Sequence, residues 1–161
     1  MWKVSFKDPM YKKVQKFNDK VTVVTLKGDL KIPMKVMNSI PKKMWDWMTK
    51  RSNPKVKVYH WQGIINVTTV GKAVRSEEDK NNPVLAERIA ECRAKIKLYN
   101  FVCNILVRYT NYYATLLKGK NWSFEYTPID DNNCIAYIYN KYNRLYFNEE
   151  KHLEELLKEH D

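Results

Sequence analysis

The sequence holds one long, unbroken helical pattern, Val84–Lys118, which reads VLAERIAECRAKIKLYNFVCNILVRYTNYYATLLK and contains neither Pro nor Gly. Its apolar residues recur at steps of three and four, the spacing that places side chains on one face of an α-helix. A helix of this length measures about 50 Å at 1.5 Å per residue. One small sheet cannot span it, so we expect that the helix either breaks or protrudes.

Two apolar stripes run along this predicted helix. The first follows its whole length and the second begins in the middle, so most of the circumference of the C-terminal half is apolar. If the helix protrudes, we expect the second stripe to contact another chain. The two stripes consist of Leu85, Ile89, Cys92, Ile96, Tyr99, Cys103, Leu106, Thr110, Tyr113 and Leu117, and of Leu98, Val102, Ile105, Tyr109, Tyr112 and Leu116.

The residues before this helix alternate between apolar and polar, as half-buried strands do. Trp2–Lys7 predicts a first strand. Asp8–Phe17 predicts a short helix, because it begins with an Asp-Pro pair typical of helix starts. Val21–Leu26 and Leu30–Val36 predict two further strands, joined by a turn at Lys27–Asp29.

A helix and a hairpin are predicted next. Ser39 and Pro41 start a helix that extends to about Arg51. Lys55–Val58 and Ile64–Val74 have the pattern of strands, and we expect them to pair as a hairpin.

The segment after the long helix is rich in Tyr. We expect strands at Trp122–Tyr126, Cys134–Tyr139 and Arg144–Phe147, connected by turns into a β-meander. Asn148 can cap a short last helix, Glu149–His160.

The predicted fold class is α+β: a mainly antiparallel sheet from the N-terminal strands, one long central helix, a C-terminal Tyr-rich β-meander and a short terminal helix. We expect a single domain over residues 1–161. A sub-boundary near residue 119 would separate a basic α+β core (1–118) from an acidic meander and helix (119–161).

Positive charge is concentrated at the N-terminal end. The chain of 161 residues has 29 Lys plus Arg and 18 Asp plus Glu, a net charge of +11. Residues 1–58 hold 15 basic and 4 acidic side chains, residues 59–120 hold 10 and 5, and residues 121–161 hold 4 and 9. This asymmetry favours a polyanionic partner for the basic end. The alternative is compositional, because an AT-rich genome also produces an excess of Lys, Asn, Tyr and Ile.

Lys residues occupy the polar positions of three predicted strands, as Lys3 and Lys7, Lys31 and Lys35, and Lys55 and Lys57. In a shared sheet these pairs would align on one face. Lys is a compact charge without a bidentate fork, so such a face would hold phosphates without choosing a sequence. The alternative is a solvated face on which Lys prevents edge pairing. The predicted nucleic-acid-binding residues are Lys31, Lys35, Lys42, Lys43, Lys50, Arg51, Lys55 and Lys57.

Three Trp residues are candidates for stacking on unpaired bases: Trp45, Trp47 and Trp61. Trp45 and Trp47 lie about 200° apart around the predicted helix. We therefore expect that one of them is exposed and that the other belongs to the core.

One segment resembles an element of small phage and prophage proteins from low-GC bacteria. It comprises Val70–Val74 (VGKAV), Glu78–Asn81 (EDKN), Ala86–Ala90 (AERIA) and Arg93-Ala94. The resemblance implies a phage origin, and with it a place in the host cytoplasm, and a local strand-loop-helix unit. Gly71 in this unit permits either a bulge or a close approach of the helix. Small basic phage proteins commonly bind nucleic acid or inhibit a host protein.

The tyrosines support an alternative, a protein-binding module, because Tyr is enriched in interface cores. Such a module would be an inhibitor of a host or anti-phage defence protein, or a homodimer that forms through the long helix. The predicted interface residues are Tyr109, Tyr112, Tyr113, Tyr137, Tyr139, Tyr142 and Tyr146.

The Cys and His residues predict neither a catalytic nor a metal site. The three His residues, at positions 60, 152 and 160, share no metal-ligand spacing with one another or with the Cys residues. The Cys residues, at positions 92, 103 and 134, are expected to be buried and inert in a reducing cytosol. We favour a structural role for His60, since a general base would need a partner.

A third hypothesis is a metal-dependent hydrolase around Asp130 and Asp131, but a Pro-Ile-Asp-Asp-Asn-Asn run is ordinary turn chemistry. No nucleotide-binding glycine motif and no membrane-spanning run occurs. We therefore expect a cytoplasmic, non-enzymatic protein without a cofactor and without a membrane partner.

Overall fold

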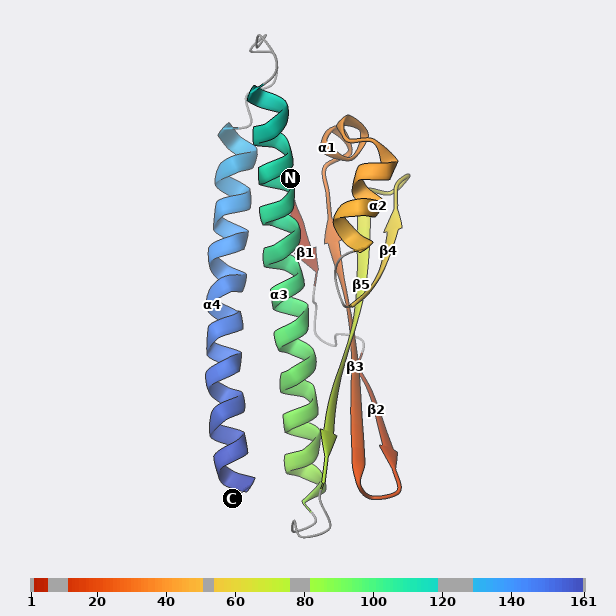
Figure 1. Ribbon diagram of the computed structural model, residues 1–161, viewed down its shortest axis with the longest axis vertical. Coiled ribbons are helices and arrows are strands. Elements are labelled where there is room, and N and C mark those ends of the chain that lie inside the picture. The colour runs from red at the N-terminus through yellow and green to blue at the C-terminus, as the bar shows by residue number, and fades with distance from the viewer. Residues whose placement is uncertain (1, 6–11, 51–53, 76–81, 119–128, 161) are drawn as a thin grey trace.

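The structure, a computed structural model, describes residues 2–5, 12–50, 54–75, 82–118 and 129–160. Two long helices and an antiparallel sheet of five strands form three layers, with the longer helix in the middle (Figure 1). The elements are β1 (Lys3–Ser5), β2 (Lys12–Phe17), β3 (Val21–Lys31), α1 (Met34–Ser39), α2 (Lys42–Lys50), β4 (Lys55–Tyr59), β5 (Ile64–Val74), α3 (Pro83–Lys118) and α4 (Ile129–His160).

β3 is the central strand of the sheet. It pairs with β5 along its whole length, from Val21 opposite Val74 to Lys31 opposite Ile64. β1 pairs with the C-terminal end of β3 and β2 with its N-terminal half, so β1 and β2 share one edge of β3. β4 pairs with the first half of β5. The strand order is therefore β1-β3-β5-β4, with β2 beside the other end of β3.

Side chains alternate between the two sides of the long strands. Val24, Leu26 and Leu30 of β3, together with Ile65 and Val67 of β5, are buried on the side that α3 covers. The residues between them point to the opposite side and are half-buried or exposed. The sheet therefore has one apolar, covered side and one open side.

Helix α3 approaches β5 very closely at Gly71. A Cβ atom at this position would overlap the carbonyl oxygen of Ala90 and lie 2.5 Å from the amide nitrogen of Ala94. The Thr69 hydroxyl adds a hydrogen bond to the Ala94 carbonyl oxygen at 2.9 Å. The sequence was compatible with either a bulge or a close approach of the helix at Gly71, and the close approach is confirmed.

The long helix is continuous, and its two described stripes are covered within the chain. The first stripe faces α4, where the Tyr99 and Tyr142 ring centroids lie 5.8 Å apart. The second faces the sheet side, where the Tyr109 ring lies 4.8 Å from that of Trp2 and 6.4 Å from that of Trp45. The expectation that the helix breaks is wrong. The sheet and α4 cover most of the described part of both stripes, and contact with another chain through the second stripe stays a prediction.

The predicted C-terminal β-meander is also wrong. Residues 129–160 form the single helix α4, so no strands exist at Cys134–Tyr139 and Arg144–Phe147. The predicted short helix Glu149–His160 is the last part of α4. The strand predicted at Trp122–Tyr126 lies outside the described residues.

Tertiary packing explains why this segment is helical. Tyr and Ile favour strands when considered locally. However, the buried side chains of α4 recur mostly at helical steps, as Ile135, Ile138, Tyr142 and Leu156 show. A helix with this spacing presents an apolar stripe, interrupted at Glu149, to the first stripe of α3, and this burial outweighs local propensity.

The helix predicted at Asp8–Phe17 is a strand over its described part, because residues 12–17 form β2. A tight turn folds β2 back onto β3. Asn18 and Asp19 both have positive φ (51° and 56°), and the Lys20 amide donates to the Phe17 carbonyl oxygen at 3.1 Å. Asn and Asp tolerate this left-handed backbone, which matches the twist of a hairpin.

The turn predicted at Lys27–Asp29 and the strand predicted at Leu30–Val36 are also wrong. β3 continues through Gly28 to Lys31, because Gly28 pairs directly with a residue of β5. Pro33 then ends the extended stretch and precedes α1, and its carbonyl oxygen accepts two amides of the first turn at 2.9 Å. Pro cannot donate to a ladder, but it fits a helix start.

The coarse prediction is confirmed: the fold is α+β, with an antiparallel sheet from N-terminal strands and a long central helix. The predicted helix at residues 39–51 contains α2, and the predicted hairpin is β4 paired with β5. Within the described residues, no helix combines the length and apolar character needed to cross a membrane.

We expect Gly71→Ala to destabilise the protein by about 1–3 kcal/mol, since the added methyl group meets backbone atoms that cannot rotate away. Urea denaturation followed by far-ultraviolet circular dichroism measures this change. Val70→Ala is the matched control, because Val70 points to the open side of the same strand. Equal stability of the wild type and Gly71→Ala would contradict the close approach.

Candidate nucleic-acid interface

Five Lys side chains project from the open side of the sheet. Strand register places them together, since Lys3 lies opposite Lys31, and Lys27 and Lys55 flank the same residue of β5. Lys57 lies one row further along β4. All five are exposed. We call this set, Lys3, Lys27, Lys31, Lys55 and Lys57, the Lys face.

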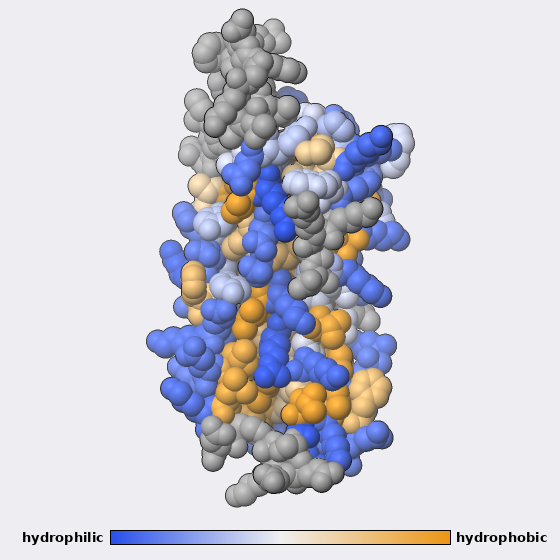
Figure 2. Space-filling view, viewed as in Figure 1, coloured by the Kyte–Doolittle hydropathy of each residue, from blue (hydrophilic) through white to orange (hydrophobic). Residues whose placement is uncertain are grey.

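Helices α2 and α3 pack against the other side of the sheet. Trp45 and Met48 of α2 belong to the same buried cluster as Ile65, Val67 and Leu98. Figure 2 shows hydrophilic side chains along the right edge of the molecule, with apolar patches between them. The helices therefore leave the Lys face open.

The Lys face has little negative charge. Among the described strand residues on this side, the acidic one is Asp29, and its Oδ1 accepts a hydrogen bond from Asn66 Nδ2 at 2.7 Å. Lys13 of β2 and Lys72 of β5 extend the positive charge toward the other end of the sheet. This side of the sheet therefore presents an almost uniformly cationic surface to an anion.

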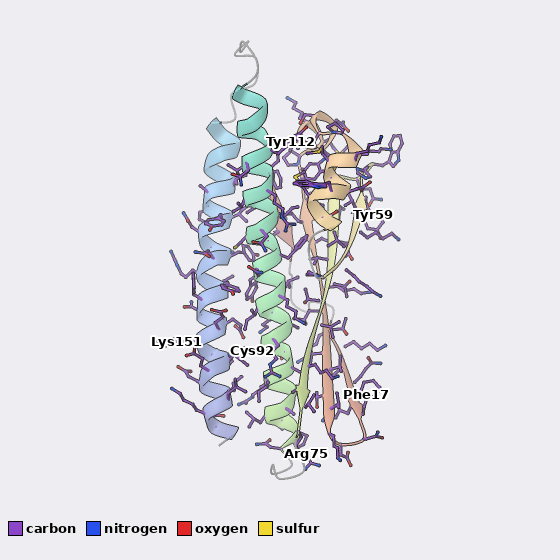
Figure 3. All side chains as sticks on the ribbon, in the orientation of Figure 1. Phe17, Tyr59, Arg75, Cys92, Tyr112 and Lys151 are labelled. Carbon is purple, nitrogen blue, oxygen red and sulfur yellow. The ribbon has the colours of Figure 1, made fainter. Side chains whose placement is uncertain are left out.

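One aromatic ring borders the Lys face, and a second lies in the turn beyond it, beside α2. Tyr59 lies on the same side of β4, and the Lys57 ammonium is 5.1 Å from its ring centroid (Figure 3). Trp61, in the turn that follows, is 90% exposed, and the Lys42 ammonium lies 5.5 Å from its ring. Alternating cations and rings suit a partner that has both phosphates and bases.

The Trp pair of α2 divides as predicted. Trp45 is completely buried, and its indole nitrogen donates to the Met37 carbonyl oxygen at 3.1 Å. Trp47 is 46% exposed. Trp45 is therefore a core residue and does not stack on a partner.

The structure brings together only part of the predicted binding set. Lys31, Lys55 and Lys57 belong to the Lys face, and Lys42 lies beside Trp61. Lys35 lies on α1, because the segment predicted as a strand there is a helix. Lys43 lies on α2, the helix predicted for it. The Lys50 side chain and Arg51 lie outside the described residues.

Sequence reasoning left out three members of this surface, Lys13, Lys27 and Lys72. Lys27 occupies a polar position in the alternating pattern of β3. It was not predicted as part of this surface because a turn was expected at Gly28. Lys13 was assigned to a helix that is a strand.

The predicted interface tyrosines do not form one surface. Tyr109 and Tyr142 are core residues, so neither is available to a partner in this fold. Tyr137 is 70% exposed. Tyr112, Tyr139 and Tyr146 are half-buried, and the Tyr113 side chain lies outside the described residues.

The structure describes several of the side chains considered for catalysis, among them Cys92, Cys103 and His60. Burial raises the pKa of the Cys92 thiol to about 12 and that of Cys103 to about 11, so both are protonated at neutral pH, as predicted for inert thiols. The His60 imidazole lies 3.7 Å from Asp46 Oδ1, beyond hydrogen-bond distance. Asp130 and Asp131 belong to the start of α4 instead of a turn, and their side chains lie outside the described residues.

A cavity of about 330 Å³ opens at the end of the sheet remote from Trp61, where the β2–β3 turn meets the start of α3. Its lining is mainly apolar, with basic side chains from Lys16, Lys20, Arg75 and Arg93. It shares no residue with the Lys face, so the two are separate features.

Comparison with protein-family models, curated protein sequences and solved structures finds no match to this chain.

The opposed pair Lys3 and Lys31 gives a test of this surface. Like charges directly across two strands destabilise a sheet. We expect Lys31→Glu to raise the free energy of unfolding by about 0.2–1 kcal/mol at low salt, and about 1 M NaCl to remove most of the gain by screening. Urea titrations at both salt concentrations measure the effect, with Lys72→Glu, an exposed position opposite Val23 on the same side of the sheet, as the control. A loss of stability at low salt would contradict the pairing.

Proposed function

We propose that the protein binds nucleic acid through phosphates, using the Lys face, with little preference among sequences and without catalysis. The observation that supports this best is the strand register, which aligns five exposed Lys residues on one open side of the sheet, where Asp29 is the one acidic neighbour among the described strand residues. Phosphates on this surface would release counterions and relieve the repulsion between Lys3 and Lys31.

The dimensions of the Lys face suit a short stretch of backbone. Lys27 and Lys31 are four residues apart on β3, about 13 Å at the usual rise of a strand, and four strands cover about 14 Å across. Several phosphates therefore fit on the face at once. Lys lacks the planar fork that reads base edges in pairs of hydrogen bonds, which is why we expect weak sequence preference.

Single-stranded nucleic acid can make a contact that a duplex cannot. Unpaired bases stack on exposed rings; Tyr59 lies at the border of the Lys face, and the exposed Trp61 follows in the next turn, beside Lys42 of α2. A duplex keeps its bases stacked on one another and would use the Lys residues alone. We therefore propose tighter binding to a flexible single strand than to a duplex of the same length.

The protein-binding alternative has weaker support. Its tyrosines are divided between the core and separate surface positions, of which Tyr137 is the most exposed. The described part of the long helix has the sheet on one side and α4 on another, which reduces the apolar surface left for a second copy. A phage origin, with a role in the host cytoplasm, remains a prediction from the resemblance.

The test compares two variants that lose the same charge from opposite sides of the molecule. One carries Lys→Gln at positions 27, 31, 55 and 57, and the control carries Gln at Lys141, Arg144, Lys151 and Lys158 of α4, all exposed. Binding of a fluorescein-labelled thymidine 20-mer and of a 20-base-pair duplex is measured by fluorescence anisotropy from 25 to 200 mM salt.

We expect the affinity of the Lys-face variant at 50 mM salt to fall at least tenfold. The slope of log K against log salt should become shallower by about 3, since each lost phosphate contact removes about 0.7–0.9. The control should stay within about threefold of the wild type. Equal losses in both variants would mean that total charge, not the Lys face, governs binding. No binding of either nucleic acid to the wild type at 50 mM salt would refute the proposal.

A further inference from the structure

The interface between α3 and α4 brings together three side chains of the kinds that ligate transition metals. Cys92 lies on the side of α3 that faces α4 (Figure 3), and Glu149 and His152 lie on α4. One potential ligand atom from each residue, the Cys sulfur, a Glu oxygen and a His ring nitrogen, lies within 4.8 Å of the other two.

The geometry of these atoms is close to that of a metal site. Glu149 and His152 are three positions apart, so they share one face of α4, and Glu149 Oε1 is 3.3 Å from His152 Nδ1. Metal–ligand bonds of 2.0–2.3 Å in a tetrahedron require ligand atoms about 3.3–3.8 Å apart. The Cys92 sulfur lies beside the same turn, 3.2 Å from the Glu149 carbonyl oxygen to which its thiol donates. Binding therefore requires side-chain rotations that bring the ligand atoms, now within 4.8 Å of one another, closer by up to about 1 Å.

The chemistry of the set selects the metal. Sulfur, imidazole nitrogen and carboxylate oxygen together suit Zn²⁺, whereas Mg²⁺ and Ca²⁺ require oxygen ligands. The carboxylates of Glu91 and Glu149 place negative charge near the Cys92 sulfur, which attracts a cation. The Lys95 ammonium places a positive charge there and partly offsets this attraction. His152 is half exposed, so a metal ion and a water ligand can reach the site from solvent.

We propose that Cys92, Glu149 and His152 bind Zn²⁺ and thereby link α3 to α4, with water as the fourth ligand. On binding, the S–H bond of Cys92 breaks, a Zn–S bond forms and the proton passes to solvent. The thiolate and the carboxylate then balance the charge of the ion. The site lies on the side of α3 away from the sheet, so it is independent of nucleic-acid binding.

Cobalt provides the direct test, because a thiolate–Co²⁺ bond gives a near-ultraviolet charge-transfer band and a four-coordinate ion gives visible d–d bands. The reduced, metal-free full chain is titrated with Co²⁺ and then with Zn²⁺, which should displace the cobalt and abolish the bands. We expect a 1:1 complex in the wild type. No charge-transfer band at millimolar Co²⁺ would overturn the proposal.

Matched variants separate this site from the other Cys and His residues. Cys92→Ser should abolish the charge-transfer band, whereas Cys103→Ser, at a second buried thiol of the same helix, and Cys134→Ser should keep it. His152→Gln should weaken Co²⁺ binding at least tenfold, whereas His60→Gln should not. A band that persists in Cys92→Ser, or that disappears in Cys103→Ser or Cys134→Ser, contradicts the assignment.

Thermal unfolding supplies a second readout. Zn²⁺ in excess should raise the unfolding midpoint of the wild type by several degrees, since an ion that binds only the folded state stabilises it. His152→Gln should remove this shift. Its side chain is half exposed, so the variant tests the site even if Cys92→Ser does not fold. An equal shift in the wild type and His152→Gln would refute the linking role.

Discussion

The backbone contact between Gly71 and α3 sets the distance between the helical layer and the sheet. Because the helix lies so close, Arg93 and Lys97 extend past the strand and donate to the carbonyl oxygens of Lys72 and Val70, at 2.6 and 2.7 Å. These carbonyls lie on β5 beyond the end of its pairing with β4. Two cations thus cover a strand edge that would otherwise accept another chain, and the open side of the sheet remains as its available surface.

Local sequence patterns predicted the helices and strands whose conformation depends only on residues near them in the sequence. The Pro- and Gly-free run of α3 and the alternation of β5 required no knowledge of distant residues, and both are confirmed. The exposure of Lys55 and Lys57 on the open side of β4 was predicted for the same reason. The errors arose where tertiary pairing decides. Gly28 looks like a turn residue, but it continues β3 because β5 pairs with it on one side.

Errors in the predicted secondary structure also concealed which residues lie close together in space. Glu149 and His152 were assigned to a short terminal helix with no position relative to α3, so Cys92 had no visible partner. Once α4 is one helix packed along α3, Cys92 donates to the Glu149 carbonyl oxygen, 57 positions away in the sequence. Spacing rules detect ligands on one element, and they do not detect ligands that meet across an interface between helices.

The layered order explains how opposite charges can occur in one small chain without neutralising one another at the binding surface. The acidic residues of the C-terminal end belong largely to α4, and α3 separates that helix from the sheet. A polyanion that approaches the molecule would therefore be attracted by the Lys face and repelled by α4, which orients the protein before contact. Binding at the Lys face, as proposed, would leave α4 and the Cys92, Glu149 and His152 cluster facing away from the nucleic acid. Occupation of one proposed site would then leave the other accessible to solvent.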